Sequence, residues 1–246
     1  MKVTYNWLKD FVEIKLSPKA LAEKLTMAGL EVTAQEECAQ DYVFEIEVTP
    51  NRPDCLSMIG IAREVAAVTG KKLKLPQSRS RQVDKSKGQP RFAIKIEDKK
   101  DCPLYSAKII RGVKVGPSPD WLKKRLELIG CRSVNNIVDI TNYILFTFGE
   151  PLHAFDLDKL SKDTISIRRA KSNEKITTID GQLRVLKPDL LVIADEKNPV
   201  AMAGIMGGRD TEVSLSTKNI LLEAAVFNPV TIRRGRQALG LASESA

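Results

Sequence analysis

The sequence predicts an α+β protein: a small N-terminal α+β module followed by a larger mixed α/β module with a mainly antiparallel sheet. Segments that alternate apolar and polar residues, typical of half-buried strands, are interspersed with segments that have helical apolar spacing and helix-end residues. The stretch from Gln77 to Gln89 holds a single apolar residue, Val83, which is typical of a linker. We therefore expect the first module at residues 1–76, a basic linker at 77–90 and the second module at 91–246.

The first module is predicted from helix-end signals around one alternating strand. Ser17 and Pro18 are typical of a helix N-terminus, and Gly29 of the end of that helix. The segment VFEIEV, Val43 to Val48, alternates apolar and acidic side chains, which indicates a strand with one solvated face. The segment TPNRPD follows, and its two prolines favour a rigid turn over a functional motif. A second helix is expected from Ser57 to Thr69.

The second module is expected to contain mostly strands. The segments that indicate them are RFAIKIE, YSAKIIRGVKV, TISIRRA, EKITTID, LLVIAD and NILLEAAVF. Asp180 and Gly181, between KITTI and QLRVL, indicate a hairpin turn. Helices are expected from Trp121 to Ile129 and from Pro229 towards Leu239.

The composition is that of a soluble globular protein, with 43% hydrophobic, 28% charged and 5% aromatic residues. No apolar run approaches the roughly 18 residues that cross a bilayer, and the N-terminus lacks the apolar core of a signal peptide. The four cysteines are scattered and there is one histidine, so neither a metal site nor a disulfide framework is expected. We expect a cytoplasmic protein without a membrane partner.

The net charge of +8 is concentrated between Lys71 and Lys100, where eleven basic residues meet three acidic ones. Self-repulsion in such a strip would keep a solvated linker extended. The same strip could also bind RNA phosphates. The two interpretations are compatible.

Three segments of the second module place small or polar residues where a site is possible. The first carries Thr141 and Asn142 and, after a Gly-Glu-Pro-Leu turn, His153, the only histidine. The second is VAMAGIMGG, in which Ala203, Gly204, Gly207 and Gly208 allow a ligand or another backbone to approach closely. The third is Glu223, an acid within the apolar strand ILLEAAVF. Each also has an ordinary structural interpretation: a satisfied core histidine, a tight turn and a residue on a solvated face.

Seven long segments carry a resemblance that covers nearly the whole chain. They are WLKDFV, LTMAGLEV, EVTPNRPDCLSMIGIAREVAAVTG, YSAKIIRGVKVGPSPDWLKKRL, NNIVDITNYILFTFGEPLHAFDLDKL, PVAMAGIMGG and ILLEAAVFNPVTIRR. In this order they resemble the N-terminal part of the bacterial phenylalanyl-tRNA synthetase beta subunit. The resemblance implies that the second module is an editing domain, which hydrolyses tyrosine wrongly attached to the phenylalanine tRNA. The pocket positions that it implies are Thr141, Asn142, His153, Ala203, Gly204 and Glu223.

The resemblance also implies a role for each of these residues. Phenylalanine and tyrosine differ by one hydroxyl, which Glu223 is expected to bind as a hydrogen-bond acceptor. Ala203 and Gly204 are expected to provide space and backbone contact around the substrate. We expect the remaining three, at positions 141, 142 and 153, to orient water and the ester. His153 as a general base and hydrolysis assisted by a hydroxyl of the terminal ribose both stay open.

The family pattern extends beyond this sequence. Residues 37–41 lead straight into VFEIEV, where family members usually carry an inserted oligonucleotide-binding-type domain, and GLASESA precedes the family's C-terminal domains. ATP and magnesium are therefore expected only for the complete synthetase, and no cofactor for this chain. The expected partners are tRNA(Phe) and the synthetase alpha subunit. The alternatives to an editing module are a structural and tRNA-docking scaffold, inactive in isolation, and a freestanding trans-editing factor.

Overall fold

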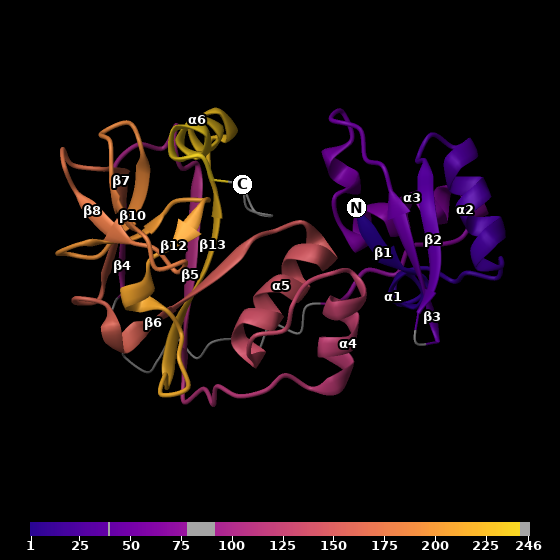
Figure 1. The fold of residues 1–246 in the computed structure, drawn as a ribbon, viewed down its shortest axis with the longest axis horizontal. Helices are drawn as coiled ribbons and strands as arrows, with labels where there is room; N and C mark the ends of the chain where they lie inside the picture. Colours follow the sequence, from indigo (N-terminus) through magenta and orange to yellow (C-terminus); the bar gives the residue numbers. More distant parts are fainter. Residues whose placement is uncertain (39, 78–91, 242–246) are drawn as a thin grey trace. The chain divides into compact units, whose positions relative to one another are not determined.

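The computed structural model describes residues 1–38, 40–77 and 92–241, which form two compact units (Figure 1). Unit 1 contains the described residues up to 77 together with residues 117–150, and unit 2 contains residues 92–116 and 151–241. Residues 117–150, expected in the second module, therefore pack in unit 1. The expected linker at 77–90 lies, apart from Gln77, outside the described residues.

Unit 1 combines one small sheet with five α-helices and one 3-10 helix among the residues described. Its elements are β1 (Lys2–Thr4), α1 (Tyr5–Leu8), α2 (Pro18–Met27), β2 (Val32–Cys38), β3 (Asp41–Ile46), the 3-10 helix η1 (Pro53–Cys55), α3 (Met58–Thr69), α4 (Asp120–Leu128) and α5 (Asn136–Phe148). The strands form an antiparallel sheet in the order β1-β3-β2.

The ends of α2 and α3 confirm the predictions made from local residue types. Ser17 Oγ accepts a hydrogen bond from the backbone N–H of Ala20 at 3.3 Å, at the start of α2. Ser57 Oγ does the same for Gly60 at 3.1 Å, at the start of α3. Gly70 ends α3 in the left-handed conformation, with φ of 64°. Each helix therefore begins with a side-chain cap that satisfies a backbone donor.

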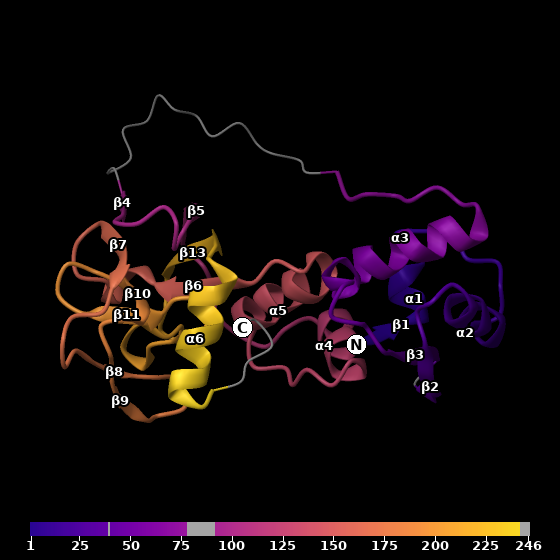
Figure 2. The ribbon, with the colours of Figure 1, turned by 90° about the horizontal axis from the view of Figure 1, so that it is seen from above.

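Helices α4 and α5 belong to unit 1 because their apolar faces share its core; Figure 2 labels both helices together with α1 and α3. Leu122 and Leu126 of α4 are buried with Trp7 of α1. The ring of Tyr143 in α5 stacks on Trp7, with centroids 5.0 Å apart and an interplanar angle of 6°. Arg125 forms a 2.6 Å ion pair with Asp10 beside these rings.

A buried carboxylate, Asp139, fixes the start of α5. It accepts hydrogen bonds from Ser118 Oγ, from Ser133 Oγ at 2.6 Å and from the backbone N–H of Val134 at 2.9 Å. Asn135 caps the same helix by accepting from two backbone N–H groups. Sequence analysis did not assign a helix to this stretch, and these tertiary contacts are what hold it there.

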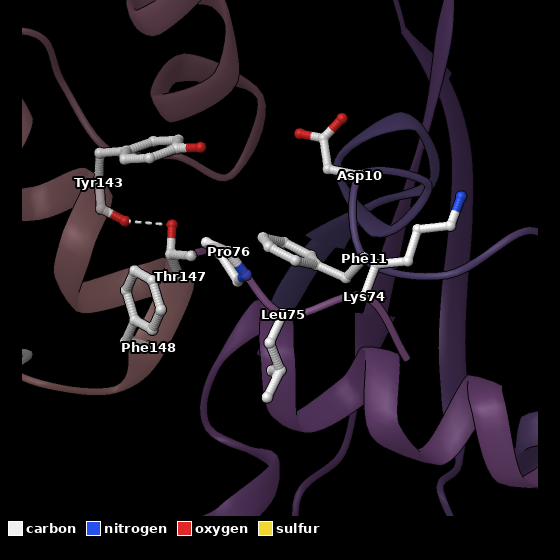
Figure 3. A pocket seen from close by; sticks show the side chains of 8 residues that line it. All are labelled: Asp10, Phe11, Lys74, Leu75, Pro76, Tyr143, Thr147 and Phe148. Carbon is white, nitrogen blue, oxygen red and sulfur yellow. Dashed lines mark hydrogen bonds between the residues drawn. The ribbon is translucent and has the colours of Figure 1, made fainter. Parts of the chain in front are cut away.

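Unit 1 also contains a pocket of about 350 Å³ beside α5 (Figure 3). Its lining consists of Asp10, Phe11, Lys74, Leu75, Pro76, Tyr143, Thr147 and Phe148. The walls are mainly apolar, and the side chains of Asp10 and Lys74 contribute opposite charges.

Unit 2 contains strands in three sheets and one long helix within the residues described. Its elements are β4 (Ala93–Ile96), β5 (Leu104–Arg111), β6 (Leu152–Asp156), η2 (Leu157–Lys159), β7 (Thr164–Arg169), β8 (Lys175–Thr177), β9 (Leu183–Val185), β10 (Leu191–Ala194), β11 (Pro199–Met202), β12 (Met206–Gly207), η3 (Arg209–Thr211), β13 (Asn219–Val226) and α6 (Pro229–Leu239). The sheet orders are β12-β11-β10-β7-β4, β5-β13-β6 and β8-β9.

These sheets confirm the predicted α+β class and the mainly antiparallel pairing. Every described strand pair in unit 2 is antiparallel except β4 with β7. The predicted hairpin at Asp180 and Gly181 is confirmed, because β8 pairs with β9 across it and Gly181 has φ of 80°.

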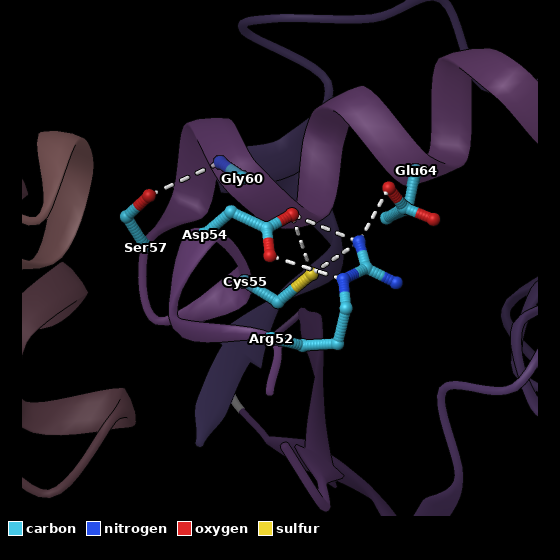
Figure 4. Close-up of polar contacts among 6 residues, drawn as sticks. All are labelled: Arg52, Asp54, Cys55, Ser57, Gly60 and Glu64. Carbon is cyan, nitrogen blue, oxygen red and sulfur yellow. Dashed lines mark hydrogen bonds and ion pairs between the residues drawn. The ribbon is translucent and has the colours of Figure 1, made fainter. Parts of the chain in front are cut away.

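The TPNRPD turn of unit 1 is held by one arginine (Figure 4). The Arg52 guanidinium donates to both carboxylate oxygens of Asp54, at 3.0 and 2.8 Å, and to Glu64 of α3 at 2.8 Å. These bonds lower the pKa of Asp54 to about 2. The turn lies so close to α3 that a Cβ on Gly60 would meet the Asp54 carbonyl oxygen at 1.8 Å. The interpretation of this segment as a rigid turn is confirmed.

Replacing Gly60 should therefore destabilise unit 1. We expect Gly60→Ala to lower the free energy of unfolding by about 3 kcal/mol, because the turn must move away from the helix. Both tryptophans, Trp7 and Trp121, lie in unit 1, so urea unfolding followed by tryptophan fluorescence reports this unit. Gly70→Ala at the other end of α3 is the control, since its Cβ meets nothing and only its positive φ costs about 1 kcal/mol. Equal losses in the two variants would contradict the steric explanation.

Candidate functional site

Two of the predicted site residues face each other in the three-stranded sheet of unit 2. Glu223 on the central strand β13 pairs with His153 on β6 and with Ala107 on β5. Residues directly opposite each other in an antiparallel pair project to the same face. The register therefore brings the His153 imidazole and the Glu223 carboxyl together on one side of the sheet, whose strands are labelled in Figure 1.

A third polar residue of this face, Tyr105, was missed by sequence analysis. It lies two residues before Ala107 on β5 and opposite Ala225, so it shares the face of Glu223. Its side chain is buried, and burial together with the charge of Glu223 raises the pKa of its phenol. The only available signal was its place in the alternation of YSAKII, which is equally typical of an ordinary core aromatic.

Three polar atoms of this face are buried without a hydrogen-bond partner in the described part of the chain. They are Glu223 Oε2, His153 Nε2 and Tyr105 Oη. The Tyr105 phenol interacts with Glu223 as a neighbouring donor, although their oxygen atoms do not meet in hydrogen-bond geometry. Buried polar atoms in proteins are almost always paired with protein or with a bound molecule. The cluster is therefore suited to receive a polar ligand group.

Burial sets the protonation of the two facing groups. Removal from water raises the pKa of Glu223 to about 8, an effect that the nearby Tyr105 phenol opposes. The same desolvation lowers the pKa of His153 to about 4. Near pH 7 the site therefore holds a mainly protonated carboxyl and a neutral imidazole.

The His153 ring is enclosed by close neighbours. The Phe155 ring lies edge-on to it, with centroids 4.5 Å apart, and a Cβ on Gly207 would lie 2.5 Å from its Cε1 atom. Only a glycine fits at this position of β12 without displacing the imidazole. The glycine-rich segment thus contacts the site through Gly207, one of the residues that the sequence indicated for close approach, with a tight turn as the alternative.

Ala203 and Gly204, the other two predicted positions in this segment, lie in the turn between β11 and β12. Ala203 is fully buried in the apolar core of unit 2. Gly204 has φ of 64°, and a Cβ there would meet Ile232 and Phe227 at 3.2 Å. Gly204 thus packs against α6 and against the residue that follows β13. That Ala203 and Gly204 contact the substrate stays a prediction.

Thr141 and Asn142 lie on α5, in unit 1. Thr141 is buried and its hydroxyl donates to the Val138 carbonyl oxygen at 2.7 Å, one turn earlier in the helix. Asn142 is half-buried. Within unit 2 the structure brings His153 and Glu223 together. That Thr141 and Asn142 belong to the same site stays a prediction.

One group of side chains in the described residues has the spacing of a metal site. The ligand atoms of Asp54, Cys55 and Glu64 lie within 4.8 Å of one another. The Arg52 guanidinium already donates to both carboxylates and lies 3.1 Å from the Cys55 sulfur (Figure 4). Burial raises the pKa of that thiol to about 11, which disfavours the thiolate that a metal requires. The group is thus better explained as a turn held by arginine.

The pocket beside α5 in Figure 3 is lined by none of the six predicted residues. Among the described helices, none combines the length and the apolar character that crossing a bilayer demands.

Comparison with known proteins gives the family. The B3/4 domain family matches residues 101–246. The chain belongs to the B3/4 domain family. The matched residues include β5, β6 and β13, and therefore His153, Glu223 and Tyr105, as well as α5.

The wider similarity extends beyond the B3/4 domain. Phenylalanine–tRNA ligase beta subunits of Carboxydothermus hydrogenoformans and Fusobacterium nucleatum are each 50% identical over 206 residues, or 84% of this chain. The chain spans about a quarter of the length of these relatives, with 25% and 26% covered. These matches confirm the resemblance predicted from the sequence.

A solved structure shares the fold. An N-terminal fragment of the phenylalanyl-tRNA synthetase beta-subunit from Pyrococcus horikoshii superposes with a TM-score of 0.51 at 18% identity. The alignment covers 100% of this chain and 73% of that fragment. The B3/4 domain and its preceding residues are therefore arranged on a known fold.

The raised pKa of Glu223 predicts a stability that depends on pH. With a value of about 8 in the folded state and 4.5 as the ordinary value, the stabilising contribution of the protonated carboxyl is complete below pH 4.5 and is lost as pH rises through 8. Glu223→Gln should remove this dependence and make unit 2 more stable than the unmodified protein at pH 9, by an amount on the order of 3 to 5 kcal/mol.

The measurement is urea unfolding at pH 5 and pH 9, followed by the NMR signal of His153, the only histidine and a residue of unit 2. The exposed Glu212→Gln in the same unit is the matched control. If the free energy of unfolding changed with pH in the same way for the unmodified protein and Glu223→Gln, Glu223 would ionise as in water.

Proposed function

We propose that the chain carries the site that hydrolyses tyrosine wrongly attached to tRNA(Phe), in support of phenylalanyl-tRNA formation by a larger enzyme. The observation that carries this proposal is the pairing of half-buried His153 with buried Glu223 on one face of the sheet, where buried polar atoms of both have no partner in the described residues. The relatives named phenylalanine–tRNA ligase beta subunit support the choice of tRNA(Phe).

Glu223 is suited to select tyrosine. A pocket shaped for an apolar ring rejects an added hydroxyl only modestly, whereas a buried polar group that needs that hydroxyl rejects the ring without it. A protonated carboxyl still accepts a hydrogen bond at its carbonyl oxygen, and it can also donate one. Phenylalanine would leave Glu223 Oε2 unpaired, as it is in the described structure.

His153 is better suited to orient the reacting groups than to remove a proton. An imidazole with a pKa of about 4 holds a proton weakly near neutral pH. Its neutral nitrogen can still align a water molecule or a ribose hydroxyl of the tRNA end, which favours the substrate-assisted route. In this proposal Thr141 and Asn142 bind the ester, and Ala203 with Gly204 gives room to the amino acid.

The other components follow from the same proposal. The acting form is cytoplasmic and contains the synthetase alpha subunit and tRNA(Phe). ATP and magnesium serve the aminoacylation reaction elsewhere in that enzyme, and hydrolysis by this chain requires neither.

One observation favours the second candidate function, a structural and tRNA-docking scaffold. The backbone of Gly207 lies directly against the His153 ring, so a ligand reaches the imidazole only from its remaining sides. A scaffold of this kind would bind tRNA without hydrolysing its ester.

Deacylation of tyrosyl-tRNA(Phe) by the chain, beside phenylalanyl-tRNA(Phe), tests the proposal. We expect tyrosine-selective release that falls about 100-fold or more in His153→Ala, because the reacting groups lose their alignment. Glu223→Ala should reduce the preference for tyrosine about tenfold, because the hydroxyl loses its partner.

Melting temperatures of the variants provide the control. An unchanged melting temperature in His153→Ala with lost activity supports a role in the reaction, whereas a large fall would indicate a core histidine. Release at the background rate by the folded, unmodified chain would favour the scaffold.

A further inference from the structure

The buried hydroxyl of Tyr105 makes no hydrogen bond within the residues that the structure describes. The side chain is 7% exposed, and its ring packs in the apolar core of unit 2. A phenylalanine would fill the same space without leaving a hydroxyl unpaired, so the hydroxyl calls for another explanation.

The neighbourhood of this hydroxyl points to Glu223. The two residues lie on the same face of β5 and β13, two pairs apart along the register. The Glu223 charge contributes to the raised pKa of the phenol, and the phenol opposes the effect of burial on the pKa of the carboxyl, so the two groups are close although they share no hydrogen bond. The third buried group nearby is the Cys102 thiol, which donates to the Leu104 carbonyl oxygen at 3.4 Å and is thereby paired. Among these groups, the atoms without a hydrogen-bond partner in the described residues are therefore Tyr105 Oη and Glu223 Oε2.

We propose that Tyr105 is a specificity-determining residue, whose hydroxyl binds the phenolic hydroxyl of a tyrosyl ligand together with the Glu223 carboxyl. This inference rests on the proposed function, since it assigns a further residue to the same site. A ligand hydroxyl has one proton to donate and lone pairs that accept. It donates to Glu223 Oε2 and accepts from Tyr105 Oη, which satisfies both orphaned atoms at once.

The pairing explains how a phenylalanyl group is refused. A phenyl ring in the same position offers neither a donor nor an acceptor, so both protein atoms stay buried and unpaired. Two unpaired groups discriminate more strongly than one. Tyr105 thereby adds to selection while it takes no part in bond cleavage.

A double-mutant cycle tests this assignment. The ratio of hydrolysis rates for tyrosyl-tRNA(Phe) and phenylalanyl-tRNA(Phe) is measured for the unmodified chain, Tyr105→Phe, Glu223→Gln and the double variant. We expect Tyr105→Phe to lower this ratio fivefold to tenfold, about the effect of one hydrogen bond. In the Glu223→Gln background the same change should have a smaller effect, because both residues bind one hydroxyl. Tyr42→Phe on β3 of unit 1 is the control for loss of a phenol and should leave the ratio unchanged.

A binding measurement separates this inference from the proposed function. Tyrosine amide and phenylalanine amide, which carry no ester, are titrated into each variant while the NMR signal of His153 is followed. Tyrosine amide should bind more tightly than phenylalanine amide to the unmodified chain, and Tyr105→Phe should reduce that preference fivefold to tenfold.

The possible outcomes are distinct. Selective binding that depends on Tyr105, without hydrolysis, supports the inference and overturns the proposed function. Tyrosine-selective hydrolysis that Tyr105→Phe leaves unchanged supports the proposed function and overturns the inference. Absence of both binding and hydrolysis overturns both, and a lower melting temperature in Tyr105→Phe would assign its hydroxyl a structural partner and overturn the inference.

Discussion

The register of β13 is the constraint on which the candidate site depends. Because β13 lies between β5 and β6, Glu223 meets His153 on one side and Ala107 on the other. A slip of one residue would turn every side chain of β13 to the opposite face. Polar contacts at the strand ends hold the register. Asn219 donates to both Asp158 carboxylate oxygens, at 3.0 and 2.9 Å, and Thr217 donates to Asp156 at 2.6 Å.

Close packing of backbone closes one side of this polar face. Two adjacent glycines of the β11–β12 segment have different neighbours. A Cβ on Gly207 would strike the His153 ring, and a Cβ on Gly208 would lie 2.6 Å from the Val200 carbonyl oxygen. The segment therefore approaches both a side chain and a neighbouring strand, which no residue with a side chain allows. The imidazole is held by shape, since its Nε2 atom has no hydrogen-bond partner in the described residues.

Local structure could be predicted from the sequence, and tertiary placement could not. Ser17, Ser57 and the Asp180–Gly181 turn act on neighbouring residues, so their effect is visible in a short window. The placement of residues 117–150 in unit 1 depends on contacts such as Tyr143 with Trp7, more than a hundred residues apart. The same distinction holds for the candidate site. His153 and Glu223 stood out by residue type, whereas their pairing needs a register between distant segments, and Tyr105 resembled any strand aromatic.

Two buried acids of this chain show how a structural carboxyl differs from a ligand-binding one. Asp139 is fully buried and accepts from Ser118, Ser133 and the Val134 backbone, so its cost of burial is offset within the protein. Glu223 is almost as deeply buried, at 6% exposure, yet its Oε2 lacks a partner in the described chain and its pKa rises. A carboxyl whose partners are complete has no capacity left for a ligand. The unmet capacity at Glu223 is therefore the physical reason to place recognition on this face of the sheet.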